Sequence, residues 1–164
     1  MSKIAGIYWD DTAAAPGISL SVYFSGCHFH CPGCHNPEAQ DFNYGREYDL
    51  DIRQEIMQKL GKNGVMRTLS ILGGEPLNEE NIEDVINLIG WCKLDYPDLK
   101  IYVWTGYTIE ELEARNDDNV RAVLGNITCL IDGRYEQDKR DTTLPLRGSS
   151  NQRIIMMEDY LNGR

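Results

Sequence analysis

Short apolar runs of strand length alternate with amphipathic helical patterns along this chain. Residues 49–61 place apolar side chains four residues apart and end in a glycine, which predicts a helix, and residues 79–94 predict a second one. Runs of strand length lie before, between and after these helices, at residues 19–26, 65–74, 100–106 and 127–133. This alternation is typical of repeated βαβ units, so we expect an α/β fold with mostly parallel strands.

The chain has 164 residues, which is enough for one domain with its own core. No run approaches the roughly 18 apolar residues of a membrane span, and the first residues lack the apolar stretch of a secretory signal. The formal net charge of −10 argues against nucleic acid as a partner, because phosphate binding needs a basic face. We expect a single domain, 1–164, that is cytoplasmic and binds neither membranes nor nucleic acid.

Unusual residues follow each of the four predicted strands. A loop with three cysteines follows the first strand, and a Gly-Gly-Glu-Pro segment at 73–76 follows the second. Thr-Gly-Tyr at 105–107 and Asp-Gly-Arg-Tyr at 132–135 follow the third and fourth. Because ligands of parallel sheets gather at the carboxyl ends of the strands, these four segments are predicted to build one site.

Cys27, Cys31 and Cys34 form a C-x3-C-x2-C pattern without a fourth cysteine nearby, and Cys92 and Cys129 stand alone in apolar surroundings. Structural zinc takes four ligands, so one of the three histidines of the chain would have to complete a zinc site. Iron–sulfur clusters also usually take four cysteines. With three, one iron lacks a protein ligand, and an open metal position is how a site binds substrate. A zinc module and an electron-transfer iron–sulfur module remain the alternatives.

Five segments in a fixed order carry a family resemblance: GCHFHCPGCHNP, LGGEPL, VWTGY, IDGRY and LRGSSNQR. Together they resemble the anaerobic ribonucleotide reductase activating proteins, which are radical S-adenosylmethionine enzymes. The likeness runs from about residue 20 to residue 155. A closely related possibility is an activase of another glycyl-radical enzyme, such as pyruvate formate-lyase.

The resemblance implies a [4Fe-4S] cluster on Cys27, Cys31 and Cys34, whose open iron binds the amino and carboxylate groups of S-adenosylmethionine. It implies that an electron from the cluster cleaves this cofactor to methionine and a 5′-deoxyadenosyl radical. That radical would take a hydrogen atom from a glycine of the large subunit of the anaerobic ribonucleoside-triphosphate reductase. A small electron donor such as flavodoxin or ferredoxin would reduce the cluster.

The resemblance also implies cofactor contacts beside the cysteines. Gly33, Cys34 and His35 belong to the cluster loop, and the ring of His35 is expected to pack against the cluster or the adenine. The other two histidines of the loop, His28 and His30, are expected to be partly exposed.

Further contacts follow from the second, third and fourth strand ends. Gly73 and Gly74 lack a Cβ, so their backbone can approach a ligand closely, while Glu75 would add negative charge near the methionyl ammonium. Thr105 is expected to contact the methionyl carboxylate or the ribose, and Asp132 to reach the ribose or simply to turn the chain.

Two segments and the chain length complete these expectations. Residues 13–19 lack the arginine that family members commonly carry before the first strand, and residues 146–153 are expected to form a functional rim or a docking surface for the reductase, with a solvated loop as the alternative. A complete barrel needs more strand–helix units than this chain holds. We therefore expect a trimmed, open partial (β/α) barrel, with the C-terminal segment 146–164 at its rim.

Overall fold

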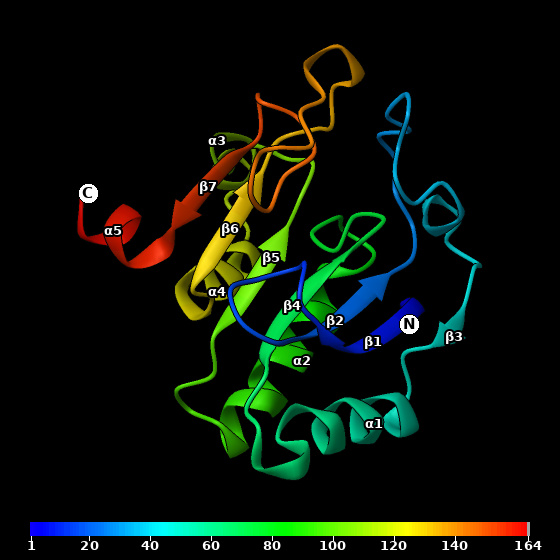
Figure 1. Ribbon diagram of the computed structural model, residues 1–164, viewed down its shortest axis with the longest axis vertical. Coiled ribbons are helices and arrows are strands. Elements are labelled where there is room, and N and C mark those ends of the chain that lie inside the picture. Colours follow the sequence, from blue (N-terminus) through cyan, green and yellow to red (C-terminus); the bar gives the residue numbers. More distant parts are fainter. Residues whose placement is uncertain (164) are drawn as a thin grey trace.

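The computed structural model describes residues 1–163 and contains one seven-stranded sheet with the order β3-β1-β2-β4-β5-β6-β7 (Figure 1). Its strands are β1 (Lys3–Asp11), β2 (Ser19–Phe24), β3 (Arg46–Glu47), β4 (Thr68–Gly73), β5 (Ile101–Trp104), β6 (Cys129–Asp132) and β7 (Arg153–Met156). The α-helices are α1 (Leu50–Leu60), α2 (Ile82–Asp95), α3 (Ile109–Ala114), α4 (Asp118–Asn126) and α5 (Met157–Asn162). Short 3-10 turns lie at Glu38–Gln40, Lys62–Gly64 and Gln137–Lys139.

The sheet is mixed. Strands β2, β4, β5 and β6 are parallel neighbours, whereas β1 is antiparallel to both β2 and β3, and β7 is antiparallel to β6. The α/β prediction is confirmed, but the prediction of mostly parallel strands is wrong. The connections from β1 to β2 and from β6 to β7 carry no α-helix, and without a helical crossover neighbouring strands pair antiparallel. The sheet is also open, with β3 and β7 at its edges, so the expected partial barrel is not confirmed.

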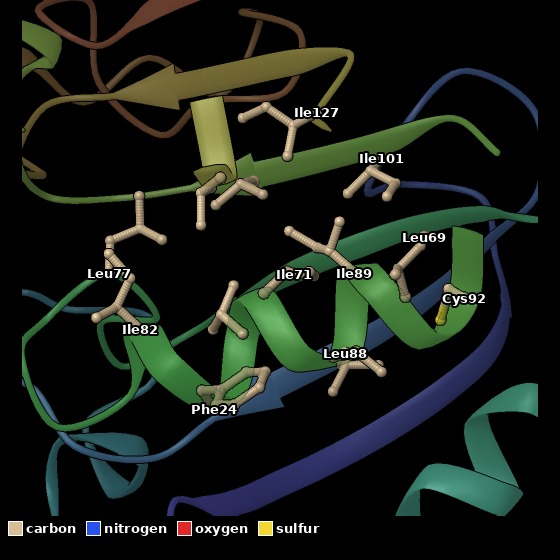
Figure 2. Close-up of a cluster of buried hydrophobic side chains, with 14 of the residues drawn as sticks. Phe24, Leu69, Ile71, Leu77, Ile82, Leu88, Ile89, Cys92, Ile101 and Ile127 are labelled. Carbon is tan, nitrogen blue, oxygen red and sulfur yellow. The ribbon is translucent and has the colours of Figure 1, made fainter. Parts of the chain in front are cut away.

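One face of the sheet packs on the helices. Figure 2 shows Ile82, Leu88, Ile89 and Cys92 of α2 beside side chains of three parallel strands. Cys92 is fully buried, as its apolar surroundings predict. Fully burying an aliphatic side chain contributes roughly 1.5–3 kcal/mol, so this layer holds the parallel strands firmly side by side.

The second predicted helix starts later than expected, and hydrogen bonds of two asparagines hold the segment before it. The prediction starts this helix at residue 79, whereas α2 begins at Ile82. Asn81 donates its backbone N–H to Asn78 Oδ1 (2.8 Å), and its side-chain amide donates to the carbonyls of Ser25 (2.9 Å) and Glu75 (3.0 Å). These bonds tie the start of α2 to the end of β2.

The segment between β1 and β2 crosses the opposite face of the sheet (Figure 1). Small polar side chains of the sheet contact it there. Ser21 Oγ donates to Asp11 Oδ2 (2.6 Å), and Ser70 Oγ donates to the carbonyl of Ala14 (3.3 Å). The crossing segment therefore packs on the middle of β2 and β4. Among residues 1–163, no helix has the length and apolar character that crossing a membrane requires.

Candidate functional site

A cavity of about 560 Å³ lies at the carboxyl ends of β2, β4, β5 and β6. All four strand ends contribute to its wall, as the sequence predicts. Its lining includes Cys27, Cys31, Cys34 and His35 after β2, Gly73, Gly74 and Glu75 after β4, Thr105 and Gly106 after β5, and Gly133, Arg134 and Tyr135 after β6.

Backbone hydrogen bonds close the cysteine loop at its base. The N–H of Gly26 donates to the carbonyl of Ala39 (2.7 Å), and the N–H of Cys27 donates to the carbonyl of Gln40 (3.1 Å). Inside the loop, the N–H of Cys34 donates to the carbonyl of Cys31 (3.1 Å). The loop therefore has a fixed frame from which its thiols reach the cavity.

The cysteine thiols are partly or fully shielded from solvent. Cys27 is buried, and Cys31 and Cys34 are half-buried. Burial raises the pKa of the Cys27 thiol and that of the Cys31 thiol above the ordinary value for cysteine. These thiols therefore carry protons at neutral pH in the free protein, and metal binding would release them.

The histidines of the loop lie at its surface. His28 and His30 are exposed, as predicted, and are hydrogen-bonded to Glu80 Oε1 and Gln40 Oε1, each at 2.9 Å. His35 is exposed on the cavity wall, where its ring lies 4.9 Å from that of Tyr135. Gly33 is outside the lining; its φ of +75° is one that glycine adopts readily.

The three thiols suit a cluster better than a single ion. Within residues 1–163, no three His, Cys, Asp or Glu side chains converge closely enough to hold one metal ion, whereas zinc needs four ligands around one point. A cubane cluster takes one thiolate per iron, so its ligands surround it from separate positions. Cys27, Cys31 and Cys34 all line the same cavity, from three different positions of one loop. The donor set therefore fits a [4Fe-4S] cluster with one iron free of protein ligands.

Gly73 and Gly74 pack directly on the base of the cysteine loop. The N–H of Gly74 donates to the carbonyl of Phe24 (2.8 Å), and that of Glu75 to the carbonyl of Gly26 (2.8 Å). A Cβ on Gly74 would collide with the carbonyl oxygens of Ala39 and Gly26, and Gly73 has a φ of +124°. Both glycines line the cavity, where the lack of a Cβ lets a ligand approach. Close backbone packing is a second reason why these positions hold glycine.

Glu75 joins the loop after β4 to the loop after β5. Its side chain is 1% exposed. Oε1 accepts hydrogen bonds from the N–H of Leu77 (2.9 Å) and from Thr105 Oγ1 (2.8 Å), and Oε2 accepts one from the N–H of Gly106 (2.6 Å). Burial raises the pKa of Glu75 to about 7, and the hydrogen bonds limit that rise.

The ring of Phe29 connects the cysteine loop to the loops after β5 and β6. The sequence did not indicate this role. The Phe29 ring lies 4.2 Å from the guanidinium carbon of Arg134 and 4.7 Å from the ring of Tyr107. A Cβ on Gly106 would come within 2.6 Å of the Phe29 ring. An aromatic residue between two exposed histidines was the available signal.

Asp132 has a different position from the one that the sequence suggests. It is 1% exposed and is not among the residues that line the cavity. Its oxygens accept hydrogen bonds from Arg153 Nε (2.9 Å), Arg153 Nη2 (2.5 Å) and the N–H of Ile109 (2.8 Å). The carboxylate is thus occupied by protein partners, and the adjacent Gly133 forms the cavity wall.

The polar segment 146–152 is an ordered rim of the cavity. Gln152 accepts the N–H groups of Gly148 (3.0 Å) and Ser149 (3.2 Å) and donates to the carbonyl of Gly133 (3.0 Å). Trp104 Nε1 donates to the carbonyl of Leu146 (2.7 Å). These bonds hold the rim against the ends of β5 and β6, so it is not a loosely solvated loop.

Comparison with known proteins decides the family. A family model described as a 4Fe-4S single cluster domain matches residues 13–155. The anaerobic ribonucleoside-triphosphate reductase-activating protein of Pasteurella multocida is 36% identical over 93% of this chain and 96% of its own length. The proteins of the same name from Vibrio cholerae and Escherichia coli are 35% and 34% identical, over 88% and 87% of this chain and 91% and 90% of their own lengths. This chain belongs to the anaerobic ribonucleoside-triphosphate reductase-activating protein family.

Membership of this activating-protein family confirms the resemblance carried by the five segments. The arginine that residues 13–19 lack has possible substitutes elsewhere in the cavity wall. In this activating protein, Arg134, Arg140 and Arg147 line the cavity on the β6 side, so guanidinium groups are present in the site from another part of the chain.

Proposed function

We propose that this protein is a radical S-adenosylmethionine activase that installs a glycyl radical on the anaerobic ribonucleoside-triphosphate reductase. Cys27, Cys31 and Cys34 would hold a [4Fe-4S] cluster, and S-adenosylmethionine would bind in the same cavity. The observation that carries the proposal is the presence of three thiols and the Gly73–Glu75 segment on one cavity wall, in a member of this activating-protein family.

When bound through Cys27, Cys31 and Cys34, the reduced cluster would supply the electron for reductive cleavage of S-adenosylmethionine, and this chemistry would remove a hydrogen atom from the α-carbon of a reductase glycine. The residues of the chain would bind S-adenosylmethionine and orient it. Gly73 and Gly74 offer backbone groups at the wall, and ionised Glu75 favours the methionyl ammonium. Thr105, held by Glu75, stands at the same wall, and the ring of His35 can stack on the adenine or the cluster.

The proposed partners are the reductase and a small electron donor such as flavodoxin or ferredoxin. The reductase follows from the names of the relatives, and a cytoplasmic location follows from the reductase. A role for Asp132 at the ribose would require its bonds to Arg153 and Ile109 to open, so the proposal assigns that side of the wall to Gly133.

Reconstitution with iron and sulfide under anaerobic conditions tests the cofactor. The protein should turn brown and hold about four irons and four sulfides per chain, which is the cubane stoichiometry. Cys31→Ala should lose the cluster, whereas Cys92→Ala, which removes a thiol from the core, should keep it. A colourless protein with one tightly bound zinc would contradict the proposal.

Product analysis and spectroscopy test the reaction and the partner. With a reductant, the reconstituted protein should convert S-adenosylmethionine to methionine and 5′-deoxyadenosine. After mixing with the reductase, a glycyl doublet should appear in the electron paramagnetic resonance spectrum. A doublet on pyruvate formate-lyase and none on the reductase would reassign the partner, and a cluster that yields no 5′-deoxyadenosine would favour an electron-transfer role.

A further inference from the structure

A second cavity, of about 430 Å³, adjoins the first on the side of β1. Tyr23, His35 and Asn36 line both cavities, so the two lie side by side and these residues separate them. We call the second cavity the β1 groove, and its lining includes Ala5, Gly6, Tyr8, Tyr23, Ala39 and Tyr44.

The β1 groove combines small residues with tyrosines. Gly6 leaves space for the ring of Tyr8, because a Cβ there would lie 2.8 Å from Tyr8 Cε2. Tyr8 and Tyr44 are 59% and 40% exposed, and the Tyr44 hydroxyl donates to Glu38 Oε2 (3.0 Å). Tyrosine offers a rigid apolar ring and a polar hydroxyl, and it is enriched where proteins bind one another. Such a surface suits an uncharged stretch of polypeptide.

The strand beside the groove has an unpaired outer edge. Strand β3 pairs only with Lys3 and Ile4 of β1, and within residues 1–163 no strand pairs with the outer edge of Gly6–Trp9. The irregular pairing of β1 with β2 falls at the two ends of this stretch, between Ile4 and Gly6 and between Trp9 and Asp11. An extended peptide can add to such an edge through its backbone N–H and C=O groups.

The far side of the cofactor cavity is built from segments that are held together by hydrogen bonds and ring contacts. The rim at 146–152 is hydrogen-bonded to Trp104 and Gly133, and Phe29 packs on Arg134 and Tyr107. The β1 groove instead adjoins the cavity beside an unpaired strand edge, which makes it the favoured approach for a macromolecular substrate.

We infer that the glycine-bearing segment of the reductase reaches the cofactor cavity along the β1 groove. The segment lies extended, pairs with the outer edge of Gly6–Trp9 and packs on Tyr8 and Tyr44. Its glycine passes Tyr23 and Asn36, where the absence of a side chain allows the backbone to enter the cavity. This inference rests on the proposed function and adds the surface that admits the protein substrate.

Two groove variants and one matched control test the inference in the reconstituted full-length protein. Tyr8→Arg and Tyr44→Arg place bulk and charge in the groove at exposed positions, and Trp91→Arg makes the same kind of change on α2, where Trp91 is 47% exposed. Formation of 5′-deoxyadenosine without reductase should stay within about twofold of wild type in all three, because surface changes have small effects. The glycyl doublet on the reductase should fall about tenfold or more in the groove variants only, as expected for lost anchor contacts.

The outcomes separate this inference from the proposed function. If wild type forms no 5′-deoxyadenosine, the proposed function fails. If wild type is active and the groove variants still yield the full glycyl doublet, or lose 5′-deoxyadenosine formation as well, the inference is overturned. Hydrogen–deuterium exchange gives an independent check, since amides within Gly6–Trp9 should gain protection when the reductase is added. Unchanged exchange there would contradict the strand pairing.

Discussion

Glu75 connects two loops of the site with one buried carboxylate, and its ionisation should register in protein stability. Its pKa is about 7 in the fold, above the ordinary value of 4.5. The native state therefore binds more protons than the unfolded state between pH 4.5 and 7, so this contribution to stability is full below pH 4.5 and is lost as pH rises through 7. At about 1.4 kcal/mol per pKa unit, the loss is roughly 3 kcal/mol.

Urea unfolding of wild type and Glu75→Gln from pH 5 to pH 8 measures this effect. The amide has one oxygen for three donors, so the variant should be the less stable protein at pH 5. The difference in free energy of unfolding should shrink toward pH 8, because only wild type carries the buried charge. A difference that does not change with pH would show that Glu75 is ionised throughout.

Gly74 is a residue of the site at which neighbouring backbone leaves no space for a side chain. Gly74→Ala should lower the free energy of unfolding by about 2 kcal/mol or more, because the new methyl group meets carbonyl oxygens of the cysteine-loop base. The iron content after reconstitution should fall with it. Gly90→Ala is the matched control: Gly90 lies in α2 with open space around it, so the change should raise stability by up to about 1 kcal/mol.

At the scale of elements, Arg153 joins three of them at the edge of the sheet. It extends from β7 to Asp132 of β6 and to Glu110 of α3, with Nη2 to Glu110 Oε2 at 2.6 Å. Arg153→Gln should destabilise the protein by about 2 kcal/mol, because it leaves the buried Asp132 carboxylate without its cation. The loss is moderate because the Arg153 side chain is partly exposed and water screens the ion pair. Thermal or urea unfolding measures the loss.

The matched control for this prediction is Arg121→Gln. Arg121 pairs with Asp118 at the exposed surface of α4, where such pairs contribute about 0–1 kcal/mol. Equal losses in the two variants would contradict a special role for Arg153 in holding β7.

The elements also show what the sequence could and could not predict. Helix α1 and the four parallel strands were predictable because their apolar residues recur with the period of a buried face. Strands β1, β3 and β7 were not, because pairing at a sheet edge depends on which strand lies alongside. In the site, the cysteines and glycines were recognisable from their spacing. Phe29 and the bonds of Asp132 were not, since they depend on contacts between loops far apart in sequence.

At the scale of the whole molecule, charge and shape act differently on association. The net charge is −10, whereas the β1 groove is lined mainly by uncharged residues. Binding to a reductase surface of opposite charge should therefore be steered by long-range attraction and held by local contacts. Raising the salt concentration should slow association much more than it speeds dissociation, as measured by surface plasmon resonance. A rate of association that is independent of salt would contradict electrostatic steering.

The hydrogen bonds at the base of the cysteine loop have a consequence for how the protein is assembled in the cell. The bonds from Gly26 to Ala39 and from Cys27 to Gln40 involve backbone only, so the frame of the loop forms with the sheet and needs no iron. We therefore expect the polypeptide to fold before the cluster is inserted. Insertion of the cluster would then be the last step of maturation, made into a loop that is already in place.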